Sequence, residues 1–232
     1  MIEKKKIEIR IKDKDIVFYF SSAKDKNKPI LFIFHGHGYN ITPAQFISEN
    51  YNVVCPMDSY GYKGLGSWYL GESGDLFWLE AMPEILRYVR EFVGNGRLYM
   101  WGSSMGGYAS ILYGHLLRAH AVYTNIPQTI LLGSKYSDNG MLKFFQPIFG
   151  DRDSVYNDLR KVINYRTPCK YFLCFNQLEG SNYFMEQGLN FISHLHSLRQ
   201  PMYIEVRPQS NHAKNHGISE SINLFRKFEL SK

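Results

Sequence analysis

The chain has 232 residues, enough for one large domain with a substantial core, and a hydrophobic content of 44% with 16% aromatic residues argues against disorder. The net charge of +6 is modest. The densest basic run, residues 4–6, lies beside acidic residues on a predicted strand, which indicates a solvated strand face. No nucleic-acid motif accompanies it, so we expect no nucleic-acid partner.

The amino-terminal half begins with a predicted hairpin. Isoleucines at positions 7, 9 and 11 alternate with charged residues, which predicts a half-buried strand. A turn at residues 13–15 leads into a second, antiparallel strand at residues 16–20. Further elements follow in chain order: buried strands at residues 30–34 and 51–55, a glycine-rich loop at 59–75, and a helix at 76–92 in which Pro83 marks a first turn or a kink.

Strands and helices alternate in the carboxyl-terminal half. The predicted strands are residues 98–101, 121–124, 171–175 and 203–206, and the predicted helices are residues 108–117, 183–198 and 218–230. Residues 131–168 show no clear strand and predict a small helical cap. The pattern predicts one α/β domain over residues 1–232, with a mostly parallel, twisted sheet and helices on both faces.

Cysteine usage and the amino terminus bear on the compartment. Cys55, Cys169 and Cys174 lie in apolar strand contexts without Cys-x-x-Cys spacing, which predicts buried free thiols in a reducing environment. The first residues do not open a secretion signal, and no apolar run approaches the length of a membrane span. We therefore expect a cytoplasmic protein without a membrane span.

The most informative segment is the Gly-x-Ser-x-Gly motif at residues 102–106, which lies between a predicted strand and a predicted helix. This order suits a nucleophile elbow, in which a sharp turn presents Ser104 at the end of a strand. Gly102 and Gly106 remove the side chains that would clash in such a turn, and Gly107 lets the helix pack close to the sheet. The motif alone is weak evidence for a nucleophile, but the predicted strand before it and the predicted helix after it strengthen that evidence.

This order of strand, turn and helix resembles the α/β-hydrolase superfamily, and the resemblance covers residues from about 30 to the end. It implies that an acid and then a histidine follow the nucleophile, each after a later strand. His212, after a strand and a short polar loop, is then the favoured base, and His216 is the alternative. Glu179 is the only acid in the expected turn, with alternatives in the cap at Asp151, Asp153 and Asp158.

Two backbone donors are expected for the developing oxyanion. One is the N–H of Met105, the residue after the nucleophile. The other is the N–H of His37, with that of Gly38 as second choice, in a His-Gly loop that resembles the oxyanion loop of esterases. The spacing of His35 and His37 also invites a metal-site interpretation, but no second ligand cluster follows, so we expect no metal or other cofactor.

The glycine-rich loop at residues 59–75 is too long for an ordinary connection, which favours a binding role. Trp68 and Tyr69 are its candidate substrate-binding residues, for stacking on a sugar or covering an acyl pocket. The alternative is that these rings pack the loop onto the core.

Together these residues predict a serine esterase that cleaves a small acyl ester through an acyl-enzyme. The segments Gly-Ser-Trp-Tyr and Gly-Ser-Ser-Met-Gly-Gly-Tyr are similar to bacterial hydrolase-type proteins of surface-polysaccharide and glycoprotein modification. That resemblance implies an O-acetylated carbohydrate as substrate. An O-acyltransferase with the same triad and a non-catalytic hydrolase-like binding protein are the alternatives, and the oligomeric state is left open.

Overall fold

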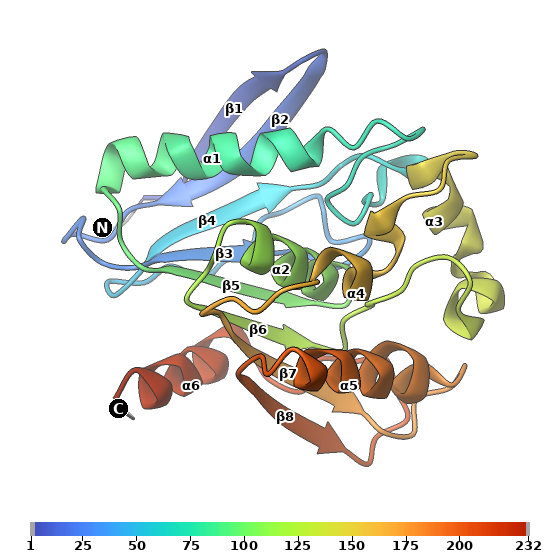
Figure 1. The fold of residues 1–232 in the computed structure, drawn as a ribbon. Helices are drawn as coiled ribbons and strands as arrows, with labels where there is room; N and C mark the ends of the chain where they lie inside the picture. Colours follow the sequence, from blue (N-terminus) through green and yellow to red (C-terminus); the bar gives the residue numbers. More distant parts are fainter. Residues whose placement is uncertain (1–2, 231–232) are drawn as a thin grey trace.

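Figure 1 shows the computed structural model, which describes the backbone of residues 3–230 and the side chains as far as Phe225. An eight-stranded sheet in the order β1-β2-β4-β3-β5-β6-β7-β8 runs through the molecule. The strands are β1 (Lys5–Ile11), β2 (Lys14–Ser21), β3 (Ile30–Phe34), β4 (Asn52–Met57), β5 (Leu98–Ser103), β6 (Ala121–Asn125), β7 (Lys170–Asn176) and β8 (Met202–Arg207). The predicted α/β class is confirmed.

The sheet is mostly parallel, with an antiparallel part at its amino-terminal edge. The hairpin of β1 and β2 pairs antiparallel, and β2 pairs antiparallel with β4. All other neighbouring strands pair parallel. Strands β3, β4 and β6 are buried along their whole length, because helices and loops cover both faces of a parallel sheet.

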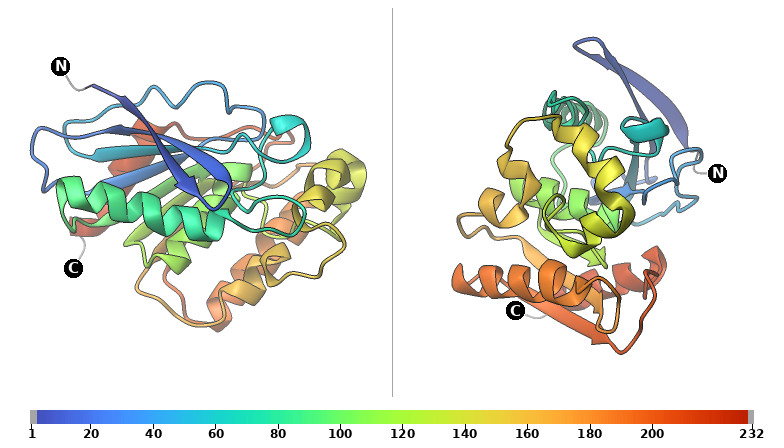
Figure 2. Two further views of the ribbon diagram at one scale, coloured as in Figure 1. Left: turned by 90° about the horizontal axis from the view of Figure 1, so that it is seen from above. Right: turned by 90° about the vertical axis from the view of Figure 1, so that its right-hand side faces the viewer.

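Helices cover both faces of the sheet (Figures 1 and 2). Helices α1 (Trp78–Val93), α2 (Met105–Leu116) and α5 (Asn190–Ser197) pack on one face, in an apolar cluster that contains Phe32. Helix α6 (Ile218–Leu230) packs on the other face, in a second cluster that contains Leu31. Because Leu31 and Phe32 are adjacent in β3, the two clusters follow the alternation of a strand. Among the described residues, no helix combines the length and apolarity that crossing a membrane requires.

The segment predicted as a helical cap, residues 131–168, forms short helical pieces. They are the π-helical turn η2 (Ser137–Met141), α3 (Leu142–Phe149), the 3₁₀ turn η3 (Val155–Asn157) and α4 (Leu159–Val162). Helix α3 lies beyond the carboxyl ends of the strands in Figure 1. The predicted helix at residues 183–198 is a π-helical turn, η4 (Phe184–Leu189), that continues into α5, and the loop at 59–75 contains a 3₁₀ turn, η1 (Tyr62–Gly64).

A buried aspartate holds the glycine-rich loop against the end of β4. The carboxylate of Asp58 accepts hydrogen bonds from the backbone N–H groups of Ser67 (2.7 Å) and Tyr69 (2.8 Å). These bonds bracket Trp68, and both Trp68 and Tyr69 have φ of 54°, in the left-handed region that costs a bulky residue about 1–2 kcal/mol. The carboxylate therefore stabilises a strained turn that brings both aromatic rings into the core.

The end of β3 is joined to the same aspartate. The backbone N–H of Asp58 donates to Nε2 of His35 (2.8 Å), so this nitrogen is unprotonated and Nδ1, 2.9 Å from the oxygen of Gly36, carries the proton. Burial lowers the pKa of His35 to about 4. Burial also raises the pKa of Asp58 to about 6. Both groups thus have structural roles. A fall in pH below about 4 charges His35, whereas a rise in pH above about 6 charges Asp58.

The raised pKa of Asp58 predicts a pH-dependent stability difference between the wild type and Asp58→Asn. A folded-state pKa above the unfolded value means that the native protein binds this proton more tightly, so the stability it contributes is present at low pH and is lost as pH rises through about 6. The wild type should lose about 2 kcal/mol relative to Asp58→Asn between about pH 4 and pH 7. Denaturant unfolding at both pH values measures this, and a difference that does not depend on pH would contradict it.

Candidate active site

The turn that carries Ser104 has no room for side chains on its glycines. Ser104 has φ of 54° and ψ of −119°, between the end of β5 and the start of α2. A Cβ on Gly102 would lie 1.9 Å from the oxygen of Gly106, and a Cβ on Gly106 would lie 2.4 Å from the oxygen of Phe34. The backbone N–H of Ser104 donates to the oxygen of Asn125 (3.0 Å), which ties the turn to β6. This is the geometry that the Gly-x-Ser-x-Gly motif predicts.

The structure brings Ser104, His212 and Glu179 together. Ser104 Oγ lies 2.8 Å from His212 Nε2, and His212 Nδ1 lies 2.5 Å from Glu179 Oε1. The three residues follow β5, β7 and β8, whose carboxyl ends meet at one edge of the sheet because these strands are parallel. An ionised carboxylate only accepts, so Nδ1 carries the imidazole proton and Nε2 is free to accept the proton of the serine hydroxyl.

Two tyrosines enclose the imidazole of His212. The ring of Tyr136 stacks on it at a centroid distance of 5.5 Å, and the ring of Tyr183 meets it edge-on at 5.3 Å. Burial, and to a lesser extent the Glu179 carboxylate, raise the pKa of Tyr136 to about 12, so this ring stays neutral. The Glu179 side chain is 6% exposed and that of His212 is 29% exposed. The pair is therefore shielded from most of the solvent, which strengthens its electrostatic interaction.

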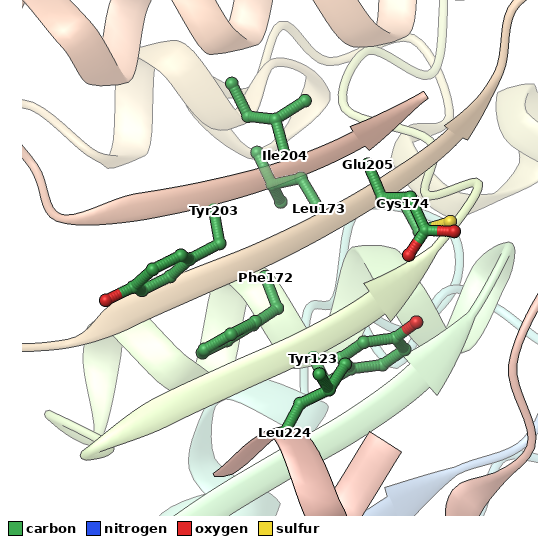
Figure 3. Close-up of a pocket in the computed structure, with 8 residues that line it drawn as sticks. All are labelled: Tyr123, Phe172, Leu173, Cys174, Tyr203, Ile204, Glu205 and Leu224. Atoms are coloured by element: carbon green, nitrogen blue, oxygen red, sulfur yellow. The ribbon is translucent and has the colours of Figure 1, made fainter. Parts of the chain in front are cut away.

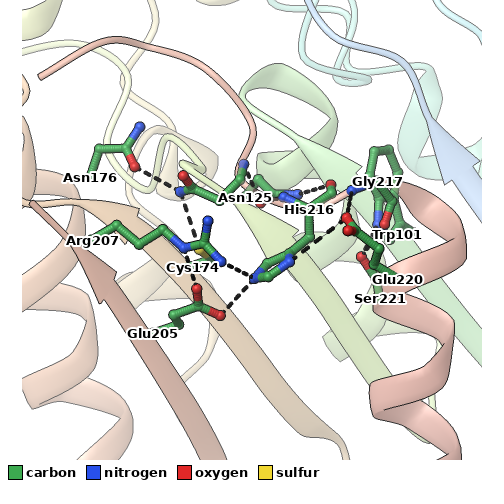
Figure 4. A network of polar contacts seen from close by, with 11 residues as sticks. Trp101, Asn125, Cys174, Asn176, Glu205, Arg207, His216, Gly217, Glu220 and Ser221 are labelled. Atoms are coloured by element: carbon green, nitrogen blue, oxygen red, sulfur yellow. Dashed lines mark hydrogen bonds and ion pairs between the residues drawn. The ribbon is translucent and has the colours of Figure 1, made fainter. Parts of the chain in front are cut away.

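His216, the alternative base, does not contact Ser104. Its Nε2 lies 2.7 Å from Glu205 Oε2 and 3.1 Å from Arg207 Nη2 (Figure 4). Cys174 lies close to this group, and the possible ligand atoms of Cys174, Glu205 and His216 lie within 4.8 Å of one another. Arg207 also pairs with Glu205. A metal ion there would face the guanidinium charge, so these residues do not fit a cation as they are arranged.

A small apolar cavity lies beside this cluster, on the face that α6 covers (Figure 3). Its volume is about 150 Å³. Its lining residues are Tyr123, Phe172, Leu173, Cys174, Tyr203, Ile204, Glu205 and Leu224. No member of the Ser104–His212–Glu179 group lines it, so this cavity is separate from the candidate active site.

Two buried asparagines hold the loop that carries His212. Asn176, at the end of β7, donates through Nδ2 to the oxygens of Asn211 (2.7 Å) and Ala213 (3.1 Å), on both sides of His212. Asn125, at the end of β6, accepts from the backbone N–H of Asn215 (3.0 Å) and donates to the oxygen of His216 (3.1 Å). Neither asparagine is exposed. The two side chains therefore fix an otherwise exposed loop relative to the strand ends.

The His-Gly loop after β3 lies next to the serine turn, since a Cβ on Gly106 would also meet the oxygen of His35 at 2.8 Å. Met105 is the first residue of α2, where backbone N–H groups have no partner within the helix. The N–H of Gly38 donates to the oxygen of Leu65 (2.9 Å), so Gly38 is not available as an oxyanion donor. The ring of His37 packs between Trp68 and Phe144, and burial lowers its pKa.

The expectation that Trp68 and Tyr69 present their rings to substrate does not hold in this structure. Both residues are fully buried. The hydroxyl of Tyr69 accepts from the backbone N–H of His35 (3.0 Å) and donates to the oxygen of Pro56 (3.1 Å). The indole N–H of Trp68 donates to Gln128 Oε1 (3.0 Å). These rings pack the loop onto the core, the alternative that the sequence left open.

The alternative acids lie elsewhere. Asp158 precedes α4 as its N-cap, where its side chain accepts from the backbone N–H of Arg160 (2.9 Å) and pairs with the guanidinium of that residue. Asp151 and Asp153 are exposed.

Three residues near the candidate triad were not anticipated: Asn125, Asn176 and Gln128. The signal available in the sequence is only that each is polar and lies at or just after a predicted buried strand.

Asn176→Ala should release the loop at residues 208–217 without unfolding the protein. The variant loses the two hydrogen bonds to the carbonyl groups that flank His212 and the one that Asn176 Oδ1 accepts from Asn215 Nδ2 (2.7 Å). We expect a loss of about 1–3 kcal/mol in the free energy of unfolding. Amide hydrogen exchange should accelerate in this loop and stay unchanged in α1. Asn190→Ala, at an exposed position of α5, is the control, and equal exchange rates in both variants would contradict the role of Asn176.

The sequence matches no protein-family model, and a search of curated proteins also found no match. Solved structures do resemble it. The acylaminoacyl peptidase of Pyrococcus horikoshii superposes with a TM-score of 0.73 at 17% identity over 98% of this chain, which spans 41% of that protein.

Two other structures match over nearly their whole length. The fluorophosphonate-binding serine hydrolase FphF of Staphylococcus aureus has a TM-score of 0.70 at 15% identity, covering 100% of this chain and 99% of its own. The S-formylglutathione hydrolase of Agrobacterium tumefaciens has a TM-score of 0.69 at 13% identity, covering 98% of this chain and 92% of its own. This chain therefore has the fold of the α/β-hydrolase superfamily.

Proposed function

We propose that this protein is a serine esterase that hydrolyses a small acyl ester through an acyl-enzyme on Ser104. The observation that carries the proposal is the continuous hydrogen-bonded series from Glu179 through His212 to Ser104. A nucleophilic hydroxyl needs a base to take its proton and an acid to orient that base, and these three side chains have that order. The neighbours that are named as serine hydrolases and esterases support the same chemistry.

The proposed reaction has two stages. His212 Nε2 takes the proton of Ser104 as Oγ attacks the ester carbonyl carbon, while Glu179 stabilises the imidazolium that forms. The backbone N–H groups of Met105 and His37 receive the negative charge on the carbonyl oxygen. Collapse of this intermediate breaks the bond to the alcohol, which leaves with the proton from His212. Water then attacks the acyl-enzyme in the same way and restores Ser104.

The side chains around Ser104 favour a small acyl group. Gln128 contacts Ser104 Oγ, and Trp68 and Tyr183 contact Gln128. All three side chains are fully buried, so packed side chains fill the space on this side of the nucleophile, which supports a small acyl group. One neighbour is named for S-formylglutathione, whose acyl group is the smallest possible. An O-acetylated carbohydrate is the substrate that we propose, on the resemblance in the loop and elbow segments.

Hydrolysis of p-nitrophenyl acetate tests the proposal. Ser104→Ala and His212→Gln should each lower kcat/KM by roughly 10³-fold or more, because each removes a group that acts in the transition state. Glu179→Gln should also lose activity, since an amide does not stabilise the imidazolium. The variants should keep the wild-type circular dichroism spectrum.

His216→Gln is the matched control for His212→Gln, because both histidines lie in the same loop and only His212 contacts Ser104. We expect it to retain activity within a few-fold of the wild type. Turnover that survives in Ser104→Ala, or that is lost equally in both histidine variants, would refute the proposed triad. Wild-type protein that neither turns over the ester nor reacts at Ser104 would favour a non-catalytic protein.

A further inference from the structure

We infer that Gln128 is a fourth catalytic residue, whose side-chain N–H donates to Ser104 Oγ, and that Trp68 positions it. The inference rests on the proposed esterase function and deepens it. Gln128 follows β6 and is fully buried. Its Nε2 lies 3.0 Å from Ser104 Oγ, whereas its Oε1 lies 3.5 Å from the same atom.

Two neighbours fix which end of the amide faces the serine. The indole N–H of Trp68 can only donate, and it lies 3.0 Å from Gln128 Oε1. The hydroxyl of Tyr183 donates its proton to the oxygen of Ile126 (2.8 Å), so toward Gln128 Nε2, at 3.1 Å, it can only accept. Both contacts require the oxygen of the amide to face Trp68 and its nitrogen to face Tyr183. The remaining N–H therefore points at Ser104.

Ser104 Oγ then has one partner for its proton and one for an oxygen lone pair, and its second lone pair stays free for attack on the ester carbon. It donates its proton to His212 Nε2 at 2.8 Å and accepts the N–H of Gln128. The second bond occupies an oxygen lone pair and restricts rotation of the hydroxyl, so the proton stays directed at the imidazole. The serine is thus oriented for proton transfer before substrate binds, which lowers the cost of reaching the reactive geometry.

The same N–H has a larger effect during the reaction. Oγ gains negative charge as it loses its proton in acylation, and it gains negative charge again when it leaves the acyl group in deacylation. A hydrogen bond to a charged acceptor is stronger than one to a neutral hydroxyl. The interaction therefore stabilises both transition states more than the resting enzyme, which is the condition for raising kcat.

The expected effect of removing the donor is measurable. Gln128→Met keeps the approximate volume without any N–H, and it should lower kcat for p-nitrophenyl acetate and the rate of reaction with a fluorophosphonate probe by roughly 10- to 100-fold. KM should change by no more than about threefold. Gln128→Glu keeps the length and the acceptor for Trp68 but replaces the donor, so it should lose at least as much.

Trp68→Phe tests the positioning residue. It keeps an aromatic ring but removes the indole N–H, which allows the amide to rotate, and the reaction rate should fall roughly 3- to 10-fold. In a Gln128→Met background the same change should have no further effect on rate, because Trp68 acts through Gln128. Full additivity of the two changes would overturn the role of Trp68.

Gln200→Met is the matched control. Gln200 is also buried and forms backbone hydrogen bonds through both ends of its amide, with Thr167 N–H and Thr167 O at 2.9 Å each, before the start of β8. This variant should lose stability but keep the wild-type rate per folded molecule. Wild-type rates in folded Gln128→Met overturn the inference while leaving the esterase proposal standing. A wild-type protein that does not react at Ser104 overturns both.

Discussion

The tight turn at Ser104 is the constraint on which the rest of the site depends. Its left-handed backbone is strained for serine and persists because the surrounding chain leaves no alternative. Gly102 and Gly106 lie on either side of Ser104 in the motif, and a side chain on either glycine would collide with a backbone oxygen. The turn therefore places a hydroxyl at the end of β5 and the first N–H groups of α2 next to it.

Two sets of buried polar contacts then bring the partners to this turn. On one side, the Asp58 carboxylate holds the strained loop at Trp68 and Tyr69, and Trp68 in turn contacts Gln128. On the other side, Asn125 and Asn176 hold the loop that carries His212. Asp58, Asn125 and Asn176 each lie at or just beyond the carboxyl end of a strand. The side chain of each forms hydrogen bonds to a neighbouring loop. The site is thus assembled mainly by strand-end residues.

The sequence predicts much of this arrangement because the relevant signals are local. The apolar strand before Ser104, the glycines of its turn and the helix after it are contiguous, and His212 and Glu179 each follow a predicted strand. The parallel topology then places those strand ends together. The α/β class and the hairpin are confirmed on the same ground, since periodicity within a segment is enough to identify them.

What the sequence does not predict depends on contacts between distant segments. The rings of Trp68 and Tyr69 are buried because Asp58, nine or more residues earlier, bonds to the backbone on both sides of Trp68. Nothing near Trp68 indicates that partner. Gln128 gives no local signal either, since its role depends on Ser104, Trp68 and Tyr183 at three other places in the chain. The first part of the helix predicted at residues 183–198 is the π-helical turn η4, and apolar periodicity does not distinguish such a turn from a regular α-helix.

The proposed esterase reaction requires a covalent bond at one oxygen, and mass spectrometry after acid quench tests this most directly. Protein mixed with p-nitrophenyl acetate, stopped in acid within the first turnovers and digested, should carry an acetyl group on the peptide that contains Ser104, at the Ser104 side chain. An acetyl group found only on lysine or histidine side chains, or no acetylated peptide while p-nitrophenol is released, would contradict the account.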